Sequence, residues 1–152
     1  ESGAFIDPRS HIYYLPELYC AYFGRCYAAF AALPPTARLA IDPDDSFGYI
    51  RGRVLAYVQD TLLRGEMNAF DAALALVALG HLGADAAAFT PALGCIAGHV
   101  GEGGRRGPFK AYEWNKMKTP TRIVVGGPEV TSAFVLMGLA LARKALRPPA
   151  KQ

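Results

Sequence analysis

Apolar residues recur along this chain at intervals of three and four positions, and segments that alternate at every second position are almost absent. A period of three to four places side chains on one face of an α-helix, whereas a period of two would indicate a strand. Proline, glycine and capping residues separate the periodic segments. The pattern therefore predicts five helices, over about 11–33, 42–63, 69–82, 90–100 and 128–146.

Two of these predicted helices carry their large apolar side chains in a single stripe. The stripe of the first helix has positions four apart, which are Tyr14, Leu18, Tyr22, Cys26 and Phe30. The stripe of the last helix consists of Val130, Phe134, Met137 and Leu141. Because an amphipathic helix buries its apolar side, we expect both stripes to face the core.

The boundaries of the central helices follow from capping residues. Pro34 and Pro35 end the first helix, and Asp42 followed by Pro43 is a typical start for the second. For the third helix, 69–82, Asn68 is the expected N-cap and Gly83 the expected terminator. This third helix is apolar nearly all round, so we expect neighbouring helices to enclose it.

An internal repeat organises the second half of the chain. One unit reads RVLAYVQDTLLRGEMNAFDAALALVALGHLG, and the other begins with ALGCIAGHVGEGG and resumes at GGPEVTSAFVLMGLALA. Each unit joins an outer helix, a glycine-containing turn and a more apolar inner helix. The turn glycines, Gly65 and Gly104, are 39 positions apart. Repetition at tens of residues is typical of solenoid and toroid folds.

These residues carry a resemblance to the squalene/hopene cyclase and protein prenyltransferase superfamily. The segment 53–79, with Gln59, Gly65, Asn68 and Asp71, resembles the glycine-containing repeat of that superfamily, and GGPEVTSAFVLMGLA resembles its G-S-P-x-x-T-T-A inner-helix start. The resemblance implies an all-α fold, a partial α/α-toroid of antiparallel helix pairs with about five helices. It also implies an isoprenoid, or another long apolar ligand, in an aromatic-lined cavity.

Composition and charge narrow the class of protein. The 152 residues include 52% hydrophobic and 19% charged residues, with a net charge of +3. A chain of this length favours one domain, assigned to 1–147 with a C-terminal tail over 148–152. The weak charge gives no reason to expect nucleic acid, and no apolar run reaches the roughly 18 residues of a transmembrane segment. Three cysteines without a CxxC pair predict reduced, buried thiols and a cytoplasmic protein.

The sequence Asp42–Pro43–Asp44–Asp45 offers one catalytic hypothesis. It matches the DxDD motif of class II terpene cyclases, in which the middle aspartate protonates the substrate, so the resemblance makes Asp44 the acid. Burial beside Asp42 and Asp45 would keep it protonated. The alternative is that these carboxylates cap a helix and interact with its dipole, which needs no catalysis.

If the predicted toroid binds a ligand, the N-termini of its inner helices face the mouth of the cavity. The candidate ligand-binding residues are therefore Asn68, Asp71, Glu129, Thr131 and Ser132, with Tyr13, Tyr14 and Trp114 as aromatic walls. Several of these also have an ordinary explanation, since Asn68 is a cap and Glu129 lies in a first turn.

A predicted loop over 101–127 combines basic and aromatic residues. Its candidate anion-binding residues are Arg105, Arg106, Lys110, Lys116 and Lys118. Such a loop suits a diphosphate, a membrane surface or an acidic partner, and the alternative is a solvated loop anchored by its aromatic residues.

No metal site or cofactor follows from the sequence. Cys95 and His99 are one helical turn apart, but a pair of ligands is a weak indication of metal binding. Two functions remain open. The chain is either a terpene-cyclase-like or prenyltransferase-like domain that binds an apolar molecule or an isoprenoid diphosphate, or a noncatalytic helical repeat that binds a partner chain, another copy of itself or a missing half of the toroid.

Overall fold

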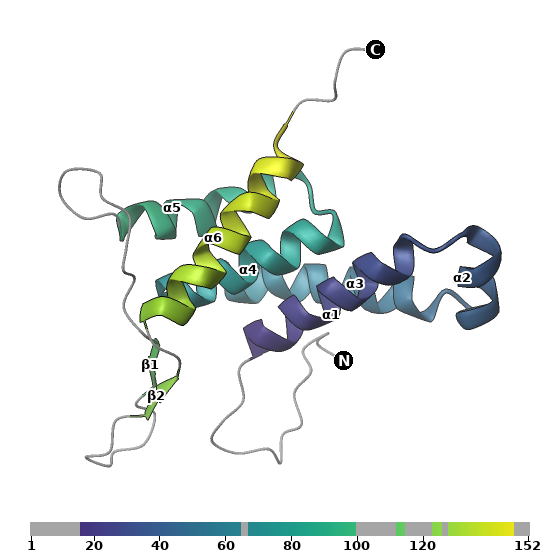
Figure 1. Cartoon of the computed structure of the whole chain (residues 1–152), viewed down its shortest axis with the longest axis horizontal. Helices are drawn as coiled ribbons and strands as arrows, with labels where there is room; N and C mark the ends of the chain where they lie inside the picture. The colour runs from purple at the N-terminus through teal and green to yellow at the C-terminus, as the bar shows by residue number, and fades with distance from the viewer. Residues whose placement is uncertain (1–15, 65–66, 100–111, 115–122, 126–127, 148–152) are drawn as a thin grey trace.

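Six α-helices account for most of the structure, a computed structural model that describes residues 16–64, 67–99, 112–114, 123–125 and 128–147. The helices are α1 (Pro16–Ala31), α2 (Pro35–Ile41), α3 (Ser46–Tyr57), α4 (Ala69–Leu82), α5 (Thr90–Gly98) and α6 (Pro128–Ala145), as Figure 1 shows. A π-helical turn, Val58–Leu62, extends α3, and a 3₁₀ turn, Ala86–Phe89, precedes α5. The all-α class is confirmed.

A short β-ribbon lies within the segment that was predicted to be a loop. Strands β1 (Tyr112–Trp114) and β2 (Ile123–Val125) pair antiparallel, with Tyr112 opposite Val125 and Trp114 opposite Ile123. The sequence predicted only a loop here, because three-residue strands are too short to show an alternating pattern. The prediction was wrong at this point.

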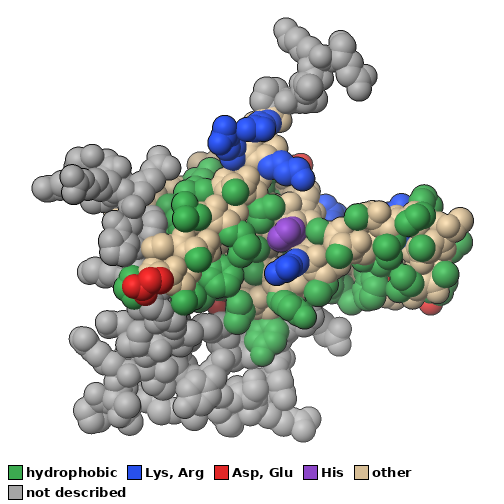
Figure 2. Space-filling model, in the orientation of Figure 1, with side chains coloured by type: hydrophobic (Ala, Val, Ile, Leu, Met, Phe, Trp, Pro, Cys, Tyr) green, Lys and Arg blue, Asp and Glu red, His purple; other side chains and the backbone are tan. Residues whose placement is uncertain are grey.

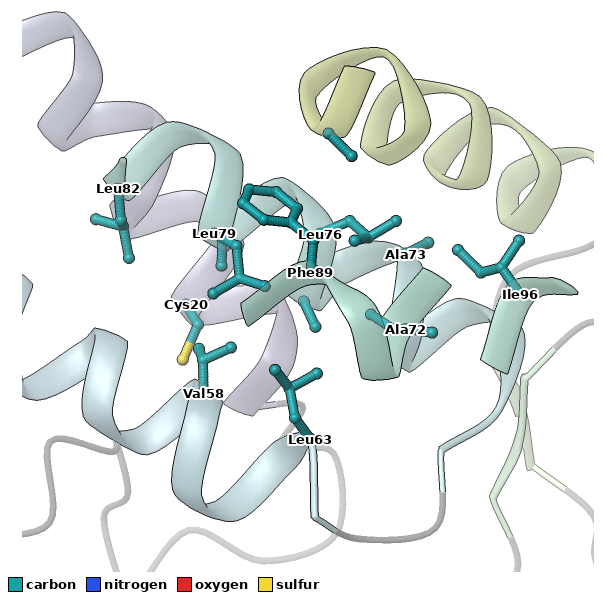
Figure 3. Close-up of a cluster of buried hydrophobic side chains, with 14 of the residues drawn as sticks. Cys20, Val58, Leu63, Ala72, Ala73, Leu76, Leu79, Leu82, Phe89 and Ile96 are labelled. Carbon is teal, nitrogen blue, oxygen red and sulfur yellow. The ribbon is translucent and has the colours of Figure 1, made fainter. Parts of the chain in front are cut away.

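Helix α4 is the centre of the bundle. Its bounds and both caps are those predicted: the Asn68 side chain accepts hydrogen bonds at the N-terminus, and Gly83 ends the helix in the left-handed region with φ 64°. Eleven of its 14 residues are buried. Figure 3 shows Leu76, Leu79 and Leu82 of α4 in the main core cluster with Phe89. The expectation that neighbours enclose this helix is confirmed.

Helices α1 and α6 run parallel to α4, one on each side of it. On the α1 side, a Cβ added to Gly24 would lie 3.3 Å from the Ala78 carbonyl oxygen and 3.3 Å from the His81 Cβ. On the α6 side, a Cβ added to Gly138 would lie 2.9 Å from the Ala73 carbonyl oxygen. The two glycines therefore allow α1 and α6 to approach α4 closely.

Helices α3 and α5 run antiparallel to α4. Arg51, near the middle of α3, donates from Nε to the Leu82 carbonyl oxygen at 2.7 Å, at the end of α4. Cys95, late in α5, donates from Sγ to the Met67 carbonyl oxygen at 3.3 Å, just before α4 begins. Successive long helices, α1, α3, α4, α5 and α6, thus alternate in direction.

The predicted stripe of α1 is largely exposed, whereas that of α6 is divided between exposed and half-buried positions. Leu18, Tyr22 and Cys26 are exposed, and α1 buries Cys20, Ala21 and Gly24 instead. In α6, Val130 and Met137 are exposed, but Phe134 and Leu141 are half-buried and pack against the core. The fully buried residues of α6 are Thr131, Val135, Gly138 and Ala142. The physical reason is that both helices approach α4 most closely through small residues. Most of their larger side chains therefore lie at the edge of the contact with α4 or in solvent.

The region between α1 and α3 also departs from the prediction. The sequence predicted no helix there, yet Pro35 begins α2, because proline fits the first turn of a helix as well as it ends the preceding one. The next helix, α3, begins at Ser46 rather than Asp42, since Asp45 adopts a left-handed conformation with φ 52°. Figure 1 shows α2 at one extremity of the molecule, away from α5 and α6.

Candidate functional site

The N-termini of α1, α4 and α6 lie at the same end of the bundle, because the three helices are parallel. The ring of Phe70, in the first turn of α4, packs edge-on against Phe134 of α6, with 5.5 Å between the ring centroids. Glu17 lies in the first turn of α1, and its negative charge raises the pKa of Asp71 in the first turn of α4. Each first turn therefore brings an acidic residue to this end: Glu17, Asp71 and Glu129.

Asn68 has the capping role that the sequence indicates. Its Oδ1 atom accepts hydrogen bonds from the backbone N–H groups of Phe70 and Asp71, each at 2.9 Å. Two of the free N–H groups that begin α4 are thereby satisfied. Since this oxygen is occupied, the cap fixes the start of α4 and the position of Asp71.

Asp71 is the residue at this end with the most altered acidity. The pKa of its carboxyl group is raised from 3.8 to about 7, chiefly by burial and then by the negative charge of Glu17, while the backbone hydrogen bond at Asn68 opposes the rise. A carboxyl group with this pKa can release or accept a proton near neutral pH. Of the predicted ligand-binding residues that the structure describes, Asp71 is the one with an environment suited to acid–base chemistry.

Two cysteines lie close to this acidic end, and both are unreactive in character. Burial raises the pKa of the Cys20 thiol to about 12, with a contribution from Glu17. Burial and the nearby Asp71 also raise the pKa of the Cys95 thiol, which donates a hydrogen bond to the Met67 carbonyl oxygen. Because only the thiolate is a strong nucleophile, neither residue is suited to covalent catalysis. All described cysteines are free, and Cys26 is exposed rather than buried as predicted.

The candidates on α6 separate from one another in the structure. Glu129 is exposed, Ser132 is half-buried, and Thr131 is fully buried against the bundle. The Oγ1 atom of Thr131 has no hydrogen-bond partner. Glu129 and Thr131 thus occupy different environments and do not form one binding surface.

The DPDD sequence lies on the outside of the molecule. Asp42 accepts hydrogen bonds from the backbone N–H groups of Ser46 at 2.8 Å and Phe47 at 2.7 Å, so its carboxylate caps α3 from four residues away. Asp44 is exposed in the preceding turn. The burial that the cyclase hypothesis expects of Asp44 is therefore not found.

An apolar pocket on α1 was not anticipated from the sequence. Tyr19, Tyr22, Phe23 and Cys26 surround an open hollow of about 170 Å³ with an almost entirely apolar lining. Their spacing of three and four residues places them on one side of α1. The spacing was visible in the sequence, but the sequence analysis assigned Tyr22 and Cys26 to a core-facing stripe.

The remaining candidates cannot be placed in this arrangement. Tyr13, Tyr14, Arg105, Arg106, Lys110, Lys116 and Lys118 lie outside the described residues, as do the repeat glycines Gly65 and Gly104. Trp114 is the last residue of β1. The predicted aromatic walls are thus untested, and Tyr19, Tyr22 and Phe23 are aromatic residues that do surround a pocket.

No family model, curated protein or solved structure matches this chain. Within the described ranges, no three side chains of the metal-binding types are grouped closely enough to hold an ion. None of the described helices has both the length and the hydropathy needed to cross a membrane.

Proposed function

We propose that this chain is an arc of an α/α-toroid, similar in architecture to squalene/hopene cyclases and protein prenyltransferases, that binds an isoprenoid or another long apolar molecule. The observation that carries the proposal is the aromatic pocket on α1. Tyr19, Tyr22 and Phe23 offer flat apolar surfaces in a hollow open to solvent, which suits a ligand without polar groups along its length.

The order of the helices supports the architectural part of the proposal. Parallel α1, α4 and α6 alternate along the chain with α3 and α5, which run the other way. A toroid needs this alternation, since one set of helices forms the inner layer and the other the outer layer. The enclosed α4 corresponds to an inner helix with neighbours on both sides.

A second candidate function is that of an interaction or oligomerisation module. Exposed apolar side chains on α1, α2, α3 and α6 favour it, including Tyr22, Leu39, Tyr49 and Leu136, which are 65–69% exposed. Exposed apolar side chains mark a protein interface when they gather into one patch. In this case the arc would be completed by another copy or by a partner chain.

Thermal stability in the presence of isoprenoids tests the first candidate. We expect farnesol or geranylgeranyl diphosphate to raise the Tm of the protein, because a ligand that binds only the folded state stabilises it. The Tyr22→Ser substitution should abolish this rise. Tyr49→Ser is a matched control, since Tyr49 is 67% exposed and Tyr22 68%, and Tyr49 lies on α3 outside the pocket.

The mass of the protein in solution tests the second candidate. A protein that stays monomeric across a dilution series, and whose Tm no isoprenoid changes, would contradict both the isoprenoid site and self-association. A concentration-dependent dimer or larger assembly that Leu136→Ser dissociates, without any effect of isoprenoids, would favour the interaction module.

A further inference from the structure

Basic side chains of three helices meet at the end of the bundle where α4 ends. They are Arg25 of α1, His81 of α4 and Lys144 of α6. Burial lowers the pKa of the His81 imidazole, and the positive charges of Arg25 and then Lys144 lower it further. The two cations therefore lie within electrostatic reach of His81, which is half-buried between them.

Packing explains why these three residues are close together. A Cβ added to Gly24 would lie 3.3 Å from the His81 Cβ, so the residue that follows Gly24, Arg25, begins beside His81. On the other side, a Cβ added to Gly80 would lie 2.7 Å from the Leu141 Cβ, and Lys144 follows Leu141 by one helical turn. Figure 2 shows a histidine with Lys or Arg side chains below and above it on one face of the molecule.

Neither Arg25 nor Lys144 forms an ion pair with a carboxylate of the described residues. The one ion pair among the described residues joins Arg64 to Asp60, on the turn that precedes α4. Arg25 and Lys144 are both exposed, so an anion from solution can reach them. Like charges brought together without a counter-charge repel one another, and a bound anion would relieve that repulsion.

The helix dipole accounts for only part of the cluster. His81 and Lys144 lie in the last turns of α4 and α6, where cations are favourable. Arg25 lies in the middle of α1, so the dipole gives no reason for its position. At the end of α4, Arg51 donates to the carbonyl oxygens of Leu82 at 2.7 Å and Gly83 at 3.2 Å, which offsets the negative end of that helix.

We propose that Arg25, His81 and Lys144 form a binding site for a phosphate group. Arg25 can donate two parallel hydrogen bonds to phosphate oxygens, and Lys144 supplies a mobile ammonium group. His81 contributes an imidazole N–H and gains a second when the bound anion favours its protonated form. The site needs no apolar ligand and shares no residue with the pocket of Tyr19, Tyr22 and Phe23.

The phosphate group belongs either to a small phosphate ester in solution or to the headgroup of a lipid. Calorimetric titration with inorganic phosphate and with glycerol phosphate tests the first source. Sedimentation with phosphatidylcholine vesicles, with and without phosphatidic acid, tests the second. Binding to the soluble phosphates identifies a small-molecule site, whereas binding only to vesicles with phosphatidic acid identifies a lipid headgroup site.

Single substitutions test the assignment of residues. We expect Arg25→Gln and Lys144→Gln each to weaken phosphate binding about tenfold, the effect of losing one charged hydrogen-bonding group. Arg64→Gln removes the same charge near the other end of α4 and should leave binding unchanged. Equal weakening in all three variants would indicate a nonspecific charge effect, and no binding in either titration or vesicle assay would overturn the proposal.

The imidazole of His81 provides a readout that does not depend on affinity. In an NMR titration, assigned with His81→Gln, phosphate should raise the pKa of His81 in the parent protein and leave it unchanged in Arg25→Gln. A pKa that phosphate does not move in the parent would overturn the site. Tyr22→Ser should retain the phosphate effect, so failure of the proposed apolar pocket can be told apart from failure of the phosphate site.

Discussion

Helices α2 and α4 are both largely apolar, but their environments are opposite. Eleven of the 14 residues of α4 are buried, whereas none of the seven residues of α2 is. Helix α4 has neighbours on several sides, and Gly24 and Gly138 allow two of them to approach its backbone. Helix α2 lies at an extremity of the molecule, where Leu39 is 65% exposed. Apolar composition therefore does not decide burial, which also requires partners with complementary shape.

The largest expected contrast between the two helices comes from shortening a leucine in each. Leu74 of α4 is completely buried, so Leu74→Ala should lower the free energy of unfolding by about 3 to 5 kcal/mol through lost burial and a cavity. Leu39→Ala in α2 should change it by less than about 0.5 kcal/mol. Urea denaturation measures both. Equal losses would show that α2 is buried in solution, against the structure.

A smaller contrast is expected from adding one methyl group to a glycine. The Cβ of Gly138→Ala would lie 2.9 Å from the Ala73 carbonyl oxygen and 3.0 Å from the Leu76 Cβ, so we expect a loss of about 2 kcal/mol. Gly94→Ala in α5 is the matched control, because its Cβ would meet nothing within 4 Å. The free energy of unfolding of this control should rise by up to about 1 kcal/mol, because alanine has a higher helix propensity than glycine. A stabilised Gly138→Ala variant, judged by its urea midpoint, would refute the close packing of α6 on α4.

The enclosure of α4 also predicts how stability depends on pH. Asp71 has a pKa of about 7 in the folded chain against 3.8 ordinarily, so the folded state retains a proton that the unfolded state releases. The stability contributed by protonated Asp71 is complete below about pH 4 and is lost as the pH rises to about 7. The side chain introduced by Asp71→Asn cannot ionise. The free energy of unfolding of this variant should therefore exceed that of the parent by about 2 kcal/mol above pH 7 and equal it near pH 4.

Denaturation at several pH values checks this expectation. Glu17→Gln should reduce the pH dependence, because the charge of Glu17 contributes to the raised pKa of Asp71. Asp44→Asn removes an exposed carboxylate and serves as the control for a general change in charge. If Asp71→Asn keeps the pH profile of the parent, Asp71 is not the titrating group.

The smallest effect is expected at the N-terminus of α4. Asn68→Ala removes the acceptor of two backbone hydrogen bonds and should cost about 1 kcal/mol in thermal or urea unfolding. Asn68→Ser retains an acceptor and should restore most of the loss. Comparable losses in the two variants would indicate that Asn68 acts through packing rather than through capping.

The sequence specifies α4 well because its signals are local. Asn68 and Gly83 mark its ends, and its all-round apolar character indicates enclosure, so its bounds were predicted correctly. For α1 the large apolar residues suggested the wrong buried side, and for α6 the prediction held only for Phe134 and Leu141, which pack against the core. The contact with α4 is made by Cys20, Ala21, Gly24 and, in α6, Gly138, whose role depends on the shape of a helix distant in sequence.

The candidate sites were predictable to different degrees. Asp71 was identified because it lies at the start of an inner-type helix, but its pKa depends on Glu17, 54 positions earlier, which no local pattern links to it. The pocket of Tyr19, Tyr22 and Phe23 had a local pattern that was assigned to the wrong side of α1. Arg25, His81 and Lys144 come from three separate helices, so only the folded chain brings them together.

The dependence of α4 on partners from both sides has a consequence during protein synthesis. Helix α1 precedes α4 on the ribosome and can cover one of its sides as soon as α4 emerges. The side that receives Gly138 has no cover until residues 128–145 have been made. For that interval the nascent chain presents an apolar surface containing Ala73 and Leu76, which a chaperone that recognises exposed apolar segments would be expected to bind.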